Sequence, residues 1–368
     1  MKAVDPGTDA LDPNAARRAI EHCYEQGWTD GLPVVPASPS AVAEFIDAAG
    51  RGPDEVIGTM PHLGRACTVE LAAINAVMAG CLPEHFPAVL AAWEALKQDG
   101  MAFGGLWQST TGSSPFFVVN GPARTELGFN SGGNVFGPGC RANATVARAI
   151  RLIAINAFDL HPQVFDQSTQ GTPAKYTCCI AENEEESPWE PLHVERGFAS
   201  EASTVAGMMI RSVAHIDNRH ATRPEELLQD LLGTIVRTGN LMHETSLCVV
   251  VLGPEHARFL ARRGFSKADV KGYLAEHATL RLADFDRVGK GALDSHTRWR
   301  VPRDHGPDTL IPDPGAQADP ERIRVLASPD AVAVVVAGAG NAGVSTVVEP
   351  VGRSFGGGVG AFPAQVEI

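Results

Sequence analysis

The alternation of apolar and polar residues predicts several helices in the first half of the chain. Two of them, over residues 14–27 and 38–50, begin at Asn14 and at Ser38 or Ser40. Small polar side chains of this kind accept hydrogen bonds from the first turn of a helix. Further apolar periodicity predicts a nearly all-apolar, buried helix, an amphipathic helix and a second buried helix, over residues 68–80, 86–100 and 145–158.

Short apolar runs between turn residues predict strands. The first is SPFFVVNGP, from residue 114, and a second opens the segment 247–278, where two helices should follow it. Residues 331–340 read as another strand, and residues 223–239 as a helix. The run over 202–216 fits a strand or a helix, because its periodicity does not separate the two.

Two segments resemble each other. FFVVNGPARTELGF (116–129) and VVVLGPEHARFLARRGF (249–265) each give an apolar strand, Gly-Pro, a helix and Gly-Phe, and AVAVVVAGAG (331–340) would be a truncated third copy. We therefore predict an α/β fold, with mixed sheets and internally repeated strand–Gly-Pro–helix units. The alternative is that strand–Gly-Pro–helix is common punctuation with no duplication behind it.

The chain of 368 residues is long enough for two lobes. We place an N-terminal α/β lobe with a Gly/Asn-rich loop at 1–200 and a C-terminal α/β lobe at 201–368. The second lobe contains a polar, proline-rich excursion at 286–322. The apolar helices at 68–80 and 145–158 suit a core or a subunit interface, and we expect a homo-oligomer.

Composition and charge narrow the range of partners. The net charge is −13 and no Lys/Arg cluster forms a basic face, so we expect no nucleic-acid partner. No apolar run approaches ~18 residues, so we expect no membrane span. The N-terminus is polar and acidic, and the seven cysteines are odd in number without a CxxC pair. These features predict reduced thiols in the cytoplasm.

The segment NSGGNVFGPGCRANATVARA (130–149) carries the strongest sign of a binding site. Glycines allow backbone N–H groups to converge, and the following helix adds its own free N–H groups and dipole. An arginine fork suits a carboxylate or phosphate. The alternative is a structural crossing of two backbones. The predicted substrate-binding residues here are Asn130, Ser131, Gly132, Gly133, Asn134, Arg141 and Asn143.

Two other polar stretches are candidates for the same site. QSTTGSSP (108–115) offers the hydroxyls of Thr111 and Ser113, which bind an anion or simply separate a helix from a strand. GWTDGLPVVP (27–36) offers Asp30, which either walls a pocket or accepts a hydrogen bond inside a tight turn.

The segment KYTCCIAENEEESPW (175–189) has the most reactive composition. A strand places Cys178 and Cys179 on opposite faces, so one thiol can face a pocket while the other is in the core. Glu182 and Asn183 follow at the exit of the strand, where sites are often found. We take Cys179, Glu182 and Asn183 as catalytic candidates. The alternative is that both cysteines are buried and inert.

The segment AHIDNRH (214–220) supplies a further acid–base candidate, His215. A metal site of His215, His220 and His256 is the alternative, although the first two do not share one helix face. GAGNAG (338–343) matches a dinucleotide fingerprint, but too little chain follows it for the rest of that unit. We read it as a glycine-rich turn near a site, and the sequence identifies no cofactor.

Several segments together resemble a bacterial family of largely uncharacterised proteins. The resemblance covers about residues 20–285 and is carried by YEQGWTDGLPVVP, TVELAAINAVMAGC, TTGSSPFFVVNGP, NSGGNVFGPGCRANATVARAIRLI, KYTCCIAENEEESPWEPLHVERGF and VVVLGPEHARFLARRGFSKADVKGYL. Members of that family are sometimes encoded beside, or fused to, small redox domains with a Sec/Cys-Gly-Ser-Cys motif. Those domains look similar to the selenoprotein part of glycine and proline reductases.

The chain departs from the family pattern at some positions. Cys140 stands where an Asn is expected, Cys178 stands where an aromatic residue is expected, and the 208–245 region differs in form. Gly-Ser-Cys is absent, so redox chemistry would need a small thiol-redox protein as partner.

Three functions remain open from the sequence. The first is an enzyme that cleaves a carbon–heteroatom bond of a carboxylate-bearing small molecule by a thiol-assisted reductive or lytic reaction, in a site between the 108–115, 130–143 and 178–183 loops. The reaction class is what the resemblance implies. The second is a metal-dependent hydrolase or lyase. The third is a non-catalytic partner subunit of a small redox protein.

Overall fold

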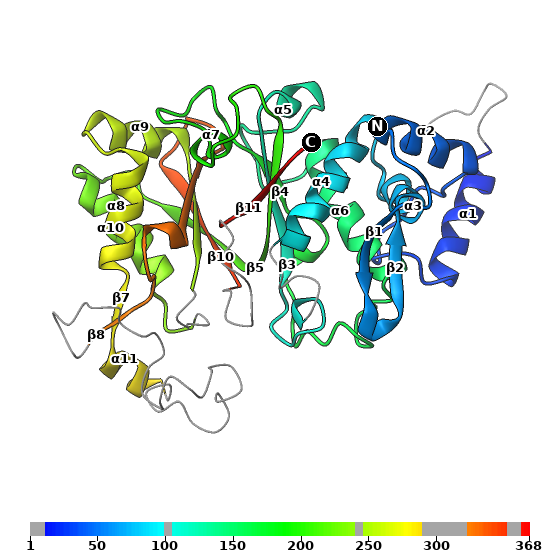
Figure 1. The fold of residues 1–368 in the computed structure, drawn as a ribbon. Helices are drawn as coiled ribbons and strands as arrows, with labels where there is room; N and C mark the ends of the chain where they lie inside the picture. The colour runs from blue at the N-terminus through cyan, green and yellow to red at the C-terminus, as the bar shows by residue number, and fades with distance from the viewer. Residues whose placement is uncertain (1–11, 99–104, 240–245, 289–321, 352–361) are drawn as a thin grey trace.

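The computed structural model describes residues 12–98, 105–239, 246–288, 322–351 and 362–368. Its centre is a seven-stranded mixed sheet with one group of helices beside each half, so the predicted α/β class is confirmed (Figure 1). The strand order is β4-β3-β5-β10-β6-β9, and β11 pairs with β5. The strands are β3 (Ser114–Asn120), β4 (Cys179–Ala181), β5 (Thr204–Asp217), β6 (Cys248–Leu252), β9 (Val332–Val336), β10 (Val344–Pro350) and β11 (Ala364–Glu367).

The central sheet consists of two halves with the same strand pairing. In the first half β3 pairs parallel with β4 and antiparallel with β5; in the second, β6 pairs parallel with β9 and antiparallel with β10. The halves meet where β5 and β10 pair antiparallel. Val119 pairs with Ala181 in one half, and Val251 pairs with Val335 in the other. In both halves one residue separates the valine from the Gly-Pro pair that follows it. The predicted repeat is therefore present in the topology, and AVAVVVAGAG corresponds to β4 rather than to a third copy.

The strands are apolar on both faces because the sheet curls and encloses one of them. Along β3, Phe117 and Val119 pack outward against the helices, whereas Phe116 and Val118 point to the enclosed side. The same alternation holds in β6, where Val250 packs outward and Val249 and Val251 point to the enclosed side. We call the enclosed side the inner face; it is built mainly from Phe116, Val118, Ile180, Ala206, Met208, Val249, Val251, Ala333, Val335 and Val348.

The two outermost strands of the curled sheet are joined where they end. The backbone N–H of Asn183, beyond β4, donates to the carbonyl of Val336 at the end of β9 over 2.7 Å. The buried carboxylate of Glu182 accepts the N–H of Val336 in return, at 3.4 Å. It also accepts the side-chain amide of Asn120 at 2.6 Å and the N–H of Leu192 at 2.8 Å. We call Glu182, Asn183 and Val336 the closing contact.

Helices from the first part of the chain cover the outer face of β3, β4 and β5 (Figure 1). The predicted cap Ser38 accepts a hydrogen bond from the first turn of its helix, and Thr68, which was not predicted as a cap, does the same for the helix that follows it. The first helix, however, is capped by the carboxylate of Asp12 rather than by Asn14, and the last begins at Arg141, before the predicted start at 145. The helices are α1 (Pro13–Glu25), α2 (Pro39–Ala49), α3 (Val69–Ala79), α4 (Phe86–Gln98), α5 (Ala123–Glu126) and α6 (Arg141–Asn156).

A second group of helices covers the outer face of β6, β9 and β10 (Figure 1). The ambiguous run at 202–216 forms the strand β5, whose first part, Thr204–Ile210, is buried on both faces. Residues 183–196 are acidic and broken by prolines, a pattern that predicts a surface loop. They instead contain a short helix whose Leu192 and His193 are buried, so this prediction is wrong. The helices are α7 (Leu192–Glu195), α8 (Pro224–Ile235), α9 (Pro254–Arg262), α10 (Lys267–His277) and α11 (Leu282–Arg287).

Two small antiparallel sheets lie outside the central one. They pair β1 (Val56–Met60) with β2 (Arg65–Thr68), and β7 (Thr279–Arg281) with β8 (Arg322–Arg324). The lobe boundary predicted at 200/201 falls between β4 and β5, which belong to the same central sheet. Most of the predicted excursion at 286–322 lies outside the described residues. Within the described part of the chain, no helix has the length and apolar character needed to cross a bilayer.

The glycine that follows β6 allows β10 to approach closely. Gly253 has an ordinary φ of −62°, but a Cβ atom there would lie 2.3 Å from the carbonyl oxygen of Val344. We expect Gly253→Ala to lower the free energy of unfolding by about 1–3 kcal/mol, because the two backbones must separate. Chemical denaturation of the purified variant measures this loss.

The matched control is Gly233→Ala in α8, where a Cβ atom meets nothing within 4 Å. This variant should be unchanged or more stable by roughly 0.5–1 kcal/mol, because alanine favours the helix. Equal stability of the two alanine variants would contradict the close-approach argument.

Candidate functional site

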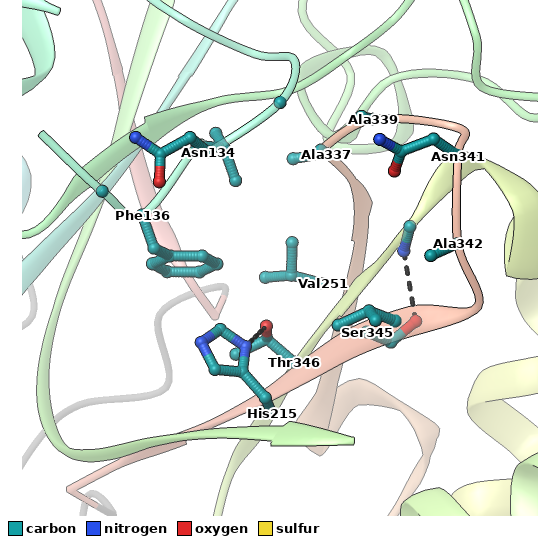
Figure 2. Close-up of a pocket in the computed structure, with 16 residues that line it drawn as sticks. Asn134, Phe136, His215, Val251, Ala337, Ala339, Asn341, Ala342, Ser345 and Thr346 are labelled. Carbon is teal, nitrogen blue, oxygen red and sulfur yellow. Dashed lines mark hydrogen bonds between the residues drawn. The ribbon is translucent and has the colours of Figure 1, made fainter. Parts of the chain in front are cut away.

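A cavity of about 390 Å³ opens between two glycine-rich loops at the edge of the inner face. One loop is 133–137, from the segment singled out in the sequence, and the other follows β9 and contains Asn341. Val251 of the inner face lies in its wall. Figure 2 shows His215 and Phe136 on one side of the cavity and Asn341 with Ala342 on the opposite side.

Asparagine side chains give the first loop its shape. The Asn130 side chain accepts the N–H of Gly132 at 2.9 Å and donates to the carbonyl of Gly133 at 3.0 Å. Asn134 has a positive φ of 60°, which asparagine tolerates, and its amide donates to the carbonyl of Pro138 at 2.8 Å. These local bonds fix the loop, so Gly133 and Asn134 line the cavity in a defined conformation.

The second loop is attached to the first and to the closing contact. The N–H of Gly338 donates to the carbonyl of Ser131 at 2.8 Å, and the Asn183 amide donates to the Gly338 carbonyl at 3.3 Å. From residue 339 to 343, no backbone N–H has an acceptor among the described residues. Ala339, Asn341 and Ala342 of this loop line the cavity. Backbone N–H groups without a protein acceptor are the donors with which such loops bind anions.

His215 is the titratable side chain among the described residues of the cavity wall. It lies on β5 directly opposite Thr346 of β10, and its Nδ1 is 2.9 Å from the Thr346 hydroxyl. Nε2 has no partner within the described segments, and the side chain is exposed. Phe136 approaches the imidazole edge to face, with ring centroids 6.2 Å apart. The ring is therefore oriented on one side and open to a ligand on the other.

Ser345 also borders the cavity, but its hydroxyl serves the fold. Successive residues of a strand point to opposite faces, so Ser345 points away from Thr346 and toward α9. Its Oγ accepts the N–H of Gly253 at 3.1 Å and is 2.7 Å from Nδ1 of His256. The other ring nitrogen of His256 lies 2.8 Å from the carbonyl of Asn218. Ser345 and His256 thus hold β10, α9 and the 218 loop together.

The predicted substrate-binding residues of the first loop divide into two groups. Gly133 and Asn134 line the cavity. Asn130, Ser131 and Gly132 shape the loop through the bonds given above, as does Asn143. The amide of Asn143 donates to the carbonyls of Asn130 and Cys179, both at 3.0 Å, and its oxygen accepts the N–H of Asn130 at 2.7 Å. Asn143 therefore ties the loop to β4.

Arg141 and Asp30 lie away from the cavity. The Arg141 guanidinium donates to the carbonyls of Gly80 and Cys81 at 2.8 and 3.2 Å, which satisfies the end of α3. Asp30 forms a two-pronged ion pair with Arg148 of α6, at 2.9 and 2.8 Å. The structure thus gives Arg141 a fold-stabilising role in place of the predicted anion contact.

Thr111 and Ser113 are also outside the cavity wall. The Ser113 hydroxyl is buried and donates to the carbonyl of Leu106 at 2.9 Å. The Thr111 hydroxyl is buried without a partner among the described residues. Their loop packs instead on Gly171, so closely that a Cβ atom placed on Gly112 would lie 2.9 Å from the Cα of Gly171. The predicted meeting of the 108–115 loop with the glycine-rich loop at one cavity is therefore wrong.

Cys178 and Cys179 do point to opposite faces, as predicted. Cys179 packs among the outer-face helices, whereas Cys178 belongs to the inner face. Burial raises the pKa of the Cys179 thiol well above its ordinary value and that of Cys178 to about 12. Neither thiol lines the cavity, so the geometry offers no support for Cys179 as a nucleophile.

Glu182 and Asn183 stand at the exit of β4, as predicted, but they form the closing contact rather than a cavity wall. Complete burial raises the pKa of Glu182 overall, although the positive charge of Lys267 and the hydrogen bonds it accepts from Leu192 and Asn120 act in the opposite direction. The sequence predicted the position of Glu182 and Asn183 at a strand exit and a strand at 331–340, but it did not predict that the two segments are in contact.

The three histidines of the metal alternative do not converge. His215 faces the cavity, His220 is exposed on the 218–222 loop, and His256 is buried with both ring nitrogens occupied. In the described segments, no group of three or more His, Cys, Asp or Glu side chains is arranged to hold a metal ion.

The sequence analysis did not identify two parts of the site, Thr346 and the place of Asn341 in the cavity wall. The GAGNAG segment was read as a turn near a site, and its asparagine was the available signal. Thr346 gives no sequence signal, because only the β5–β10 register places it opposite His215. Comparisons with known proteins found no matching family model, curated protein or solved structure for this chain.

The closing contact predicts a pH-dependent stability difference between wild type and Glu182→Gln. The glutamine amide would point an N–H group at another donor, which costs about 1–3 kcal/mol. The folded-state pKa of Glu182 lies above its ordinary value of 4.5, so its contribution to stability is present below that value and is lost as pH rises through the folded-state pKa. The stability advantage of wild type over the variant should therefore be largest near the ordinary value of 4.5 and should decrease as pH rises above it.

The control for this comparison is Glu185→Gln. A hydrogen bond from Arg124 lowers the pKa of Glu185, so its contribution is present above the unfolded-state value and lost as pH falls through the folded-state pKa. Denaturation at each pH should therefore give a wild-type advantage over Glu185→Gln that stays level above the ordinary value of 4.5 and falls only at lower pH, whereas the advantage over Glu182→Gln falls as pH rises. A wild-type advantage over Glu182→Gln that grows with pH would refute the assignment.

Proposed function

We propose that the chain is an enzyme acting on a small carboxylate-bearing molecule in the cavity beside His215. The observation that carries this proposal is that one cavity is lined both by residues of loop 339–343, whose backbone N–H groups have no acceptor among the described residues, and by one oriented imidazole. Amide donors bind an oxyanion without a counter-charge, and an imidazole transfers protons near neutral pH. The cavity volume suits a small molecule rather than a polymer.

The proposed reaction is lytic cleavage of a carbon–heteroatom bond. His215 would remove the proton from the carbon next to the carboxylate, and the electrons of that C–H bond would form a carbon–carbon double bond. The heteroatom on the next carbon would leave with the electrons of its own bond. Loop amides would stabilise the negative charge that develops on the carboxylate side. The choice of a carbon–heteroatom bond rests on the family resemblance, which we propose as the relationship of this chain.

The local geometry favours this acid–base course over thiol assistance. The thiols of Cys178 and Cys179 are buried, and neither borders the cavity. Thr346 would keep Nδ1 of His215 occupied, so that Nε2 serves as the base. Phe136 would cover the imidazole and reduce its contact with water. The proposal therefore assigns chemistry to His215 and binding to the loops.

The test uses proton exchange, which does not require the true substrate. Wild-type protein is incubated in D2O with β-amino, β-hydroxy and β-thio carboxylic acids, and proton NMR follows loss of the α-proton and formation of the alkene. We expect exchange for at least one acid, and a fall of at least about 100-fold in His215→Gln with binding retained. His220→Gln, on the exposed neighbouring loop, is the control and should match wild type.

Different failures distinguish the alternatives. Exchange that requires added zinc would favour the metal-dependent hydrolase or lyase. Turnover that appears only with a small Cys-Gly-Ser-Cys protein would favour the partner subunit. Full activity of His215→Gln, or absence of both exchange and binding in wild type, would refute the proposal.

A further inference from the structure

A second cluster of charged side chains lies between α6 and the segment that leads to β4. Arg148 and Arg151, one turn apart on α6, each bind a carboxylate. Arg148 binds Asp30, whereas Arg151 binds Asp166 together with Lys175. The cluster therefore contains three cations and two carboxylates, an excess of one positive charge.

The Arg148–Asp30 pair is internally complete. Beyond its two bonds to Asp30, the Arg148 guanidinium donates to the carbonyls of Leu32 and Pro33 at 3.2 and 2.9 Å. The Asp30 side chain is 3% exposed and also accepts the N–H of Leu32. The charges of Arg148 and Asp30 cancel. The excess positive charge therefore belongs to the second group, which consists of Arg151, Lys175 and Asp166.

In that second group one carboxylate serves two cations. Asp166 accepts Lys175 Nζ on both oxygens, at 2.8 and 2.6 Å, and accepts Arg151 Nη2 at 3.0 Å. Burial by itself would raise the pKa of Asp166, but hydrogen bonds from Lys175 and Ser168 and the two positive charges lower it overall. Asp166 is therefore ionised, and it balances only one of its two partners.

A cavity of about 360 Å³ adjoins this group. Its wall includes Arg151, Lys175, Thr172, Gln170 and Tyr176, together with Asp30, whose carboxylate is paired with Arg148. None of these residues lines the cavity at His215. The Arg151 residue is 5% exposed, yet its Nε and Nη1 have no acceptor among the described residues. Guanidinium donors thus remain available beside an open space.

A buried cation without a counter-charge is costly, because desolvation is not repaid by a partner. A bound monoanion would remove that cost. The planar fork of a guanidinium matches a carboxylate, whereas a phosphate monoester, with about −1.5 to −2 charges, would exceed the single positive excess.

We propose that this cavity is a second binding site, for the carboxylate of a small molecule held by Arg151. Tyr176, 47% exposed, offers an aromatic face for the rest of the ligand. The site is independent of the proposed chemistry at His215. Failure of either proposal leaves the other standing.

The test is calorimetric titration with benzoate, its neutral isostere benzamide and inorganic phosphate. We expect benzoate to bind, benzamide not to bind and phosphate to bind more weakly. Hydrogen–deuterium exchange with mass spectrometry then locates the ligand, with protection expected over peptides spanning 151 and 166–176. Benzoate at the His215 cavity would instead protect 133–137 and 337–346, so the two sites are read separately.

Two variants test the role of the excess charge. Arg151→Lys keeps the charge next to Asp166 but removes the fork, and it should weaken benzoate binding at this site at least tenfold. Gln170→Glu, at an exposed position in the cavity wall, supplies a carboxylate within the chain and should weaken binding at least tenfold without threatening the fold. His215→Gln is the matched control and should leave protection at 166–176 unchanged.

Three results would overturn the proposal. These are no protection at 166–176 with benzoate, equal benzoate binding there in wild type and Gln170→Glu, or tighter binding of phosphate than of benzoate.

Discussion

The closing contact is the constraint on which the rest of the site depends. A curled mixed sheet would otherwise leave β4 and β9 as open edges, with unpaired backbone groups. Glu182 and Asn183 satisfy backbone groups at the end of β9, and Asn183 also holds the carbonyl of Gly338. Since Gly338 is bonded in turn to Ser131, the same few bonds bring the two glycine-rich loops together. The bonds that close the sheet are therefore the same bonds that hold the two loops of the cavity together.

The location of charge follows from this architecture. Ionised groups are found outside the inner face, in pairs such as Arg148–Asp30 or in the group around Asp166. The cavity at the edge of the inner face carries neutral amides, a hydroxyl and one imidazole. A site of this kind attracts an anion through backbone dipoles, which have a fixed direction and need little rearrangement during a reaction.

Local signals were sufficient for the elements of the fold and insufficient for their pairing. Caps and periodicity predicted α2 and α3 closely, and the two Gly-Pro segments predicted the repeat. Two residues of the glycine-rich loop, Gly133 and Asn134, line the cavity, and their role in binding stays a prediction. The contribution of Arg141 was not predictable, because its nearest acceptors belong to the end of α3, a contact between residues some 60 positions apart. Thr346 depends in the same way on strand register.

The position of β10 has a consequence for biosynthesis. This strand occupies residues 344–350, yet it lies in the middle of the sheet between β5 and β6. Until it has left the ribosome, those two neighbours each lack a partner along one edge, and their apolar surfaces remain open to other nascent chains. A product terminated before residue 344 would thus be missing a central strand and would be a substrate for chaperones and proteases. The central sheet therefore becomes complete only after β10, at residues 344–350, has been synthesised.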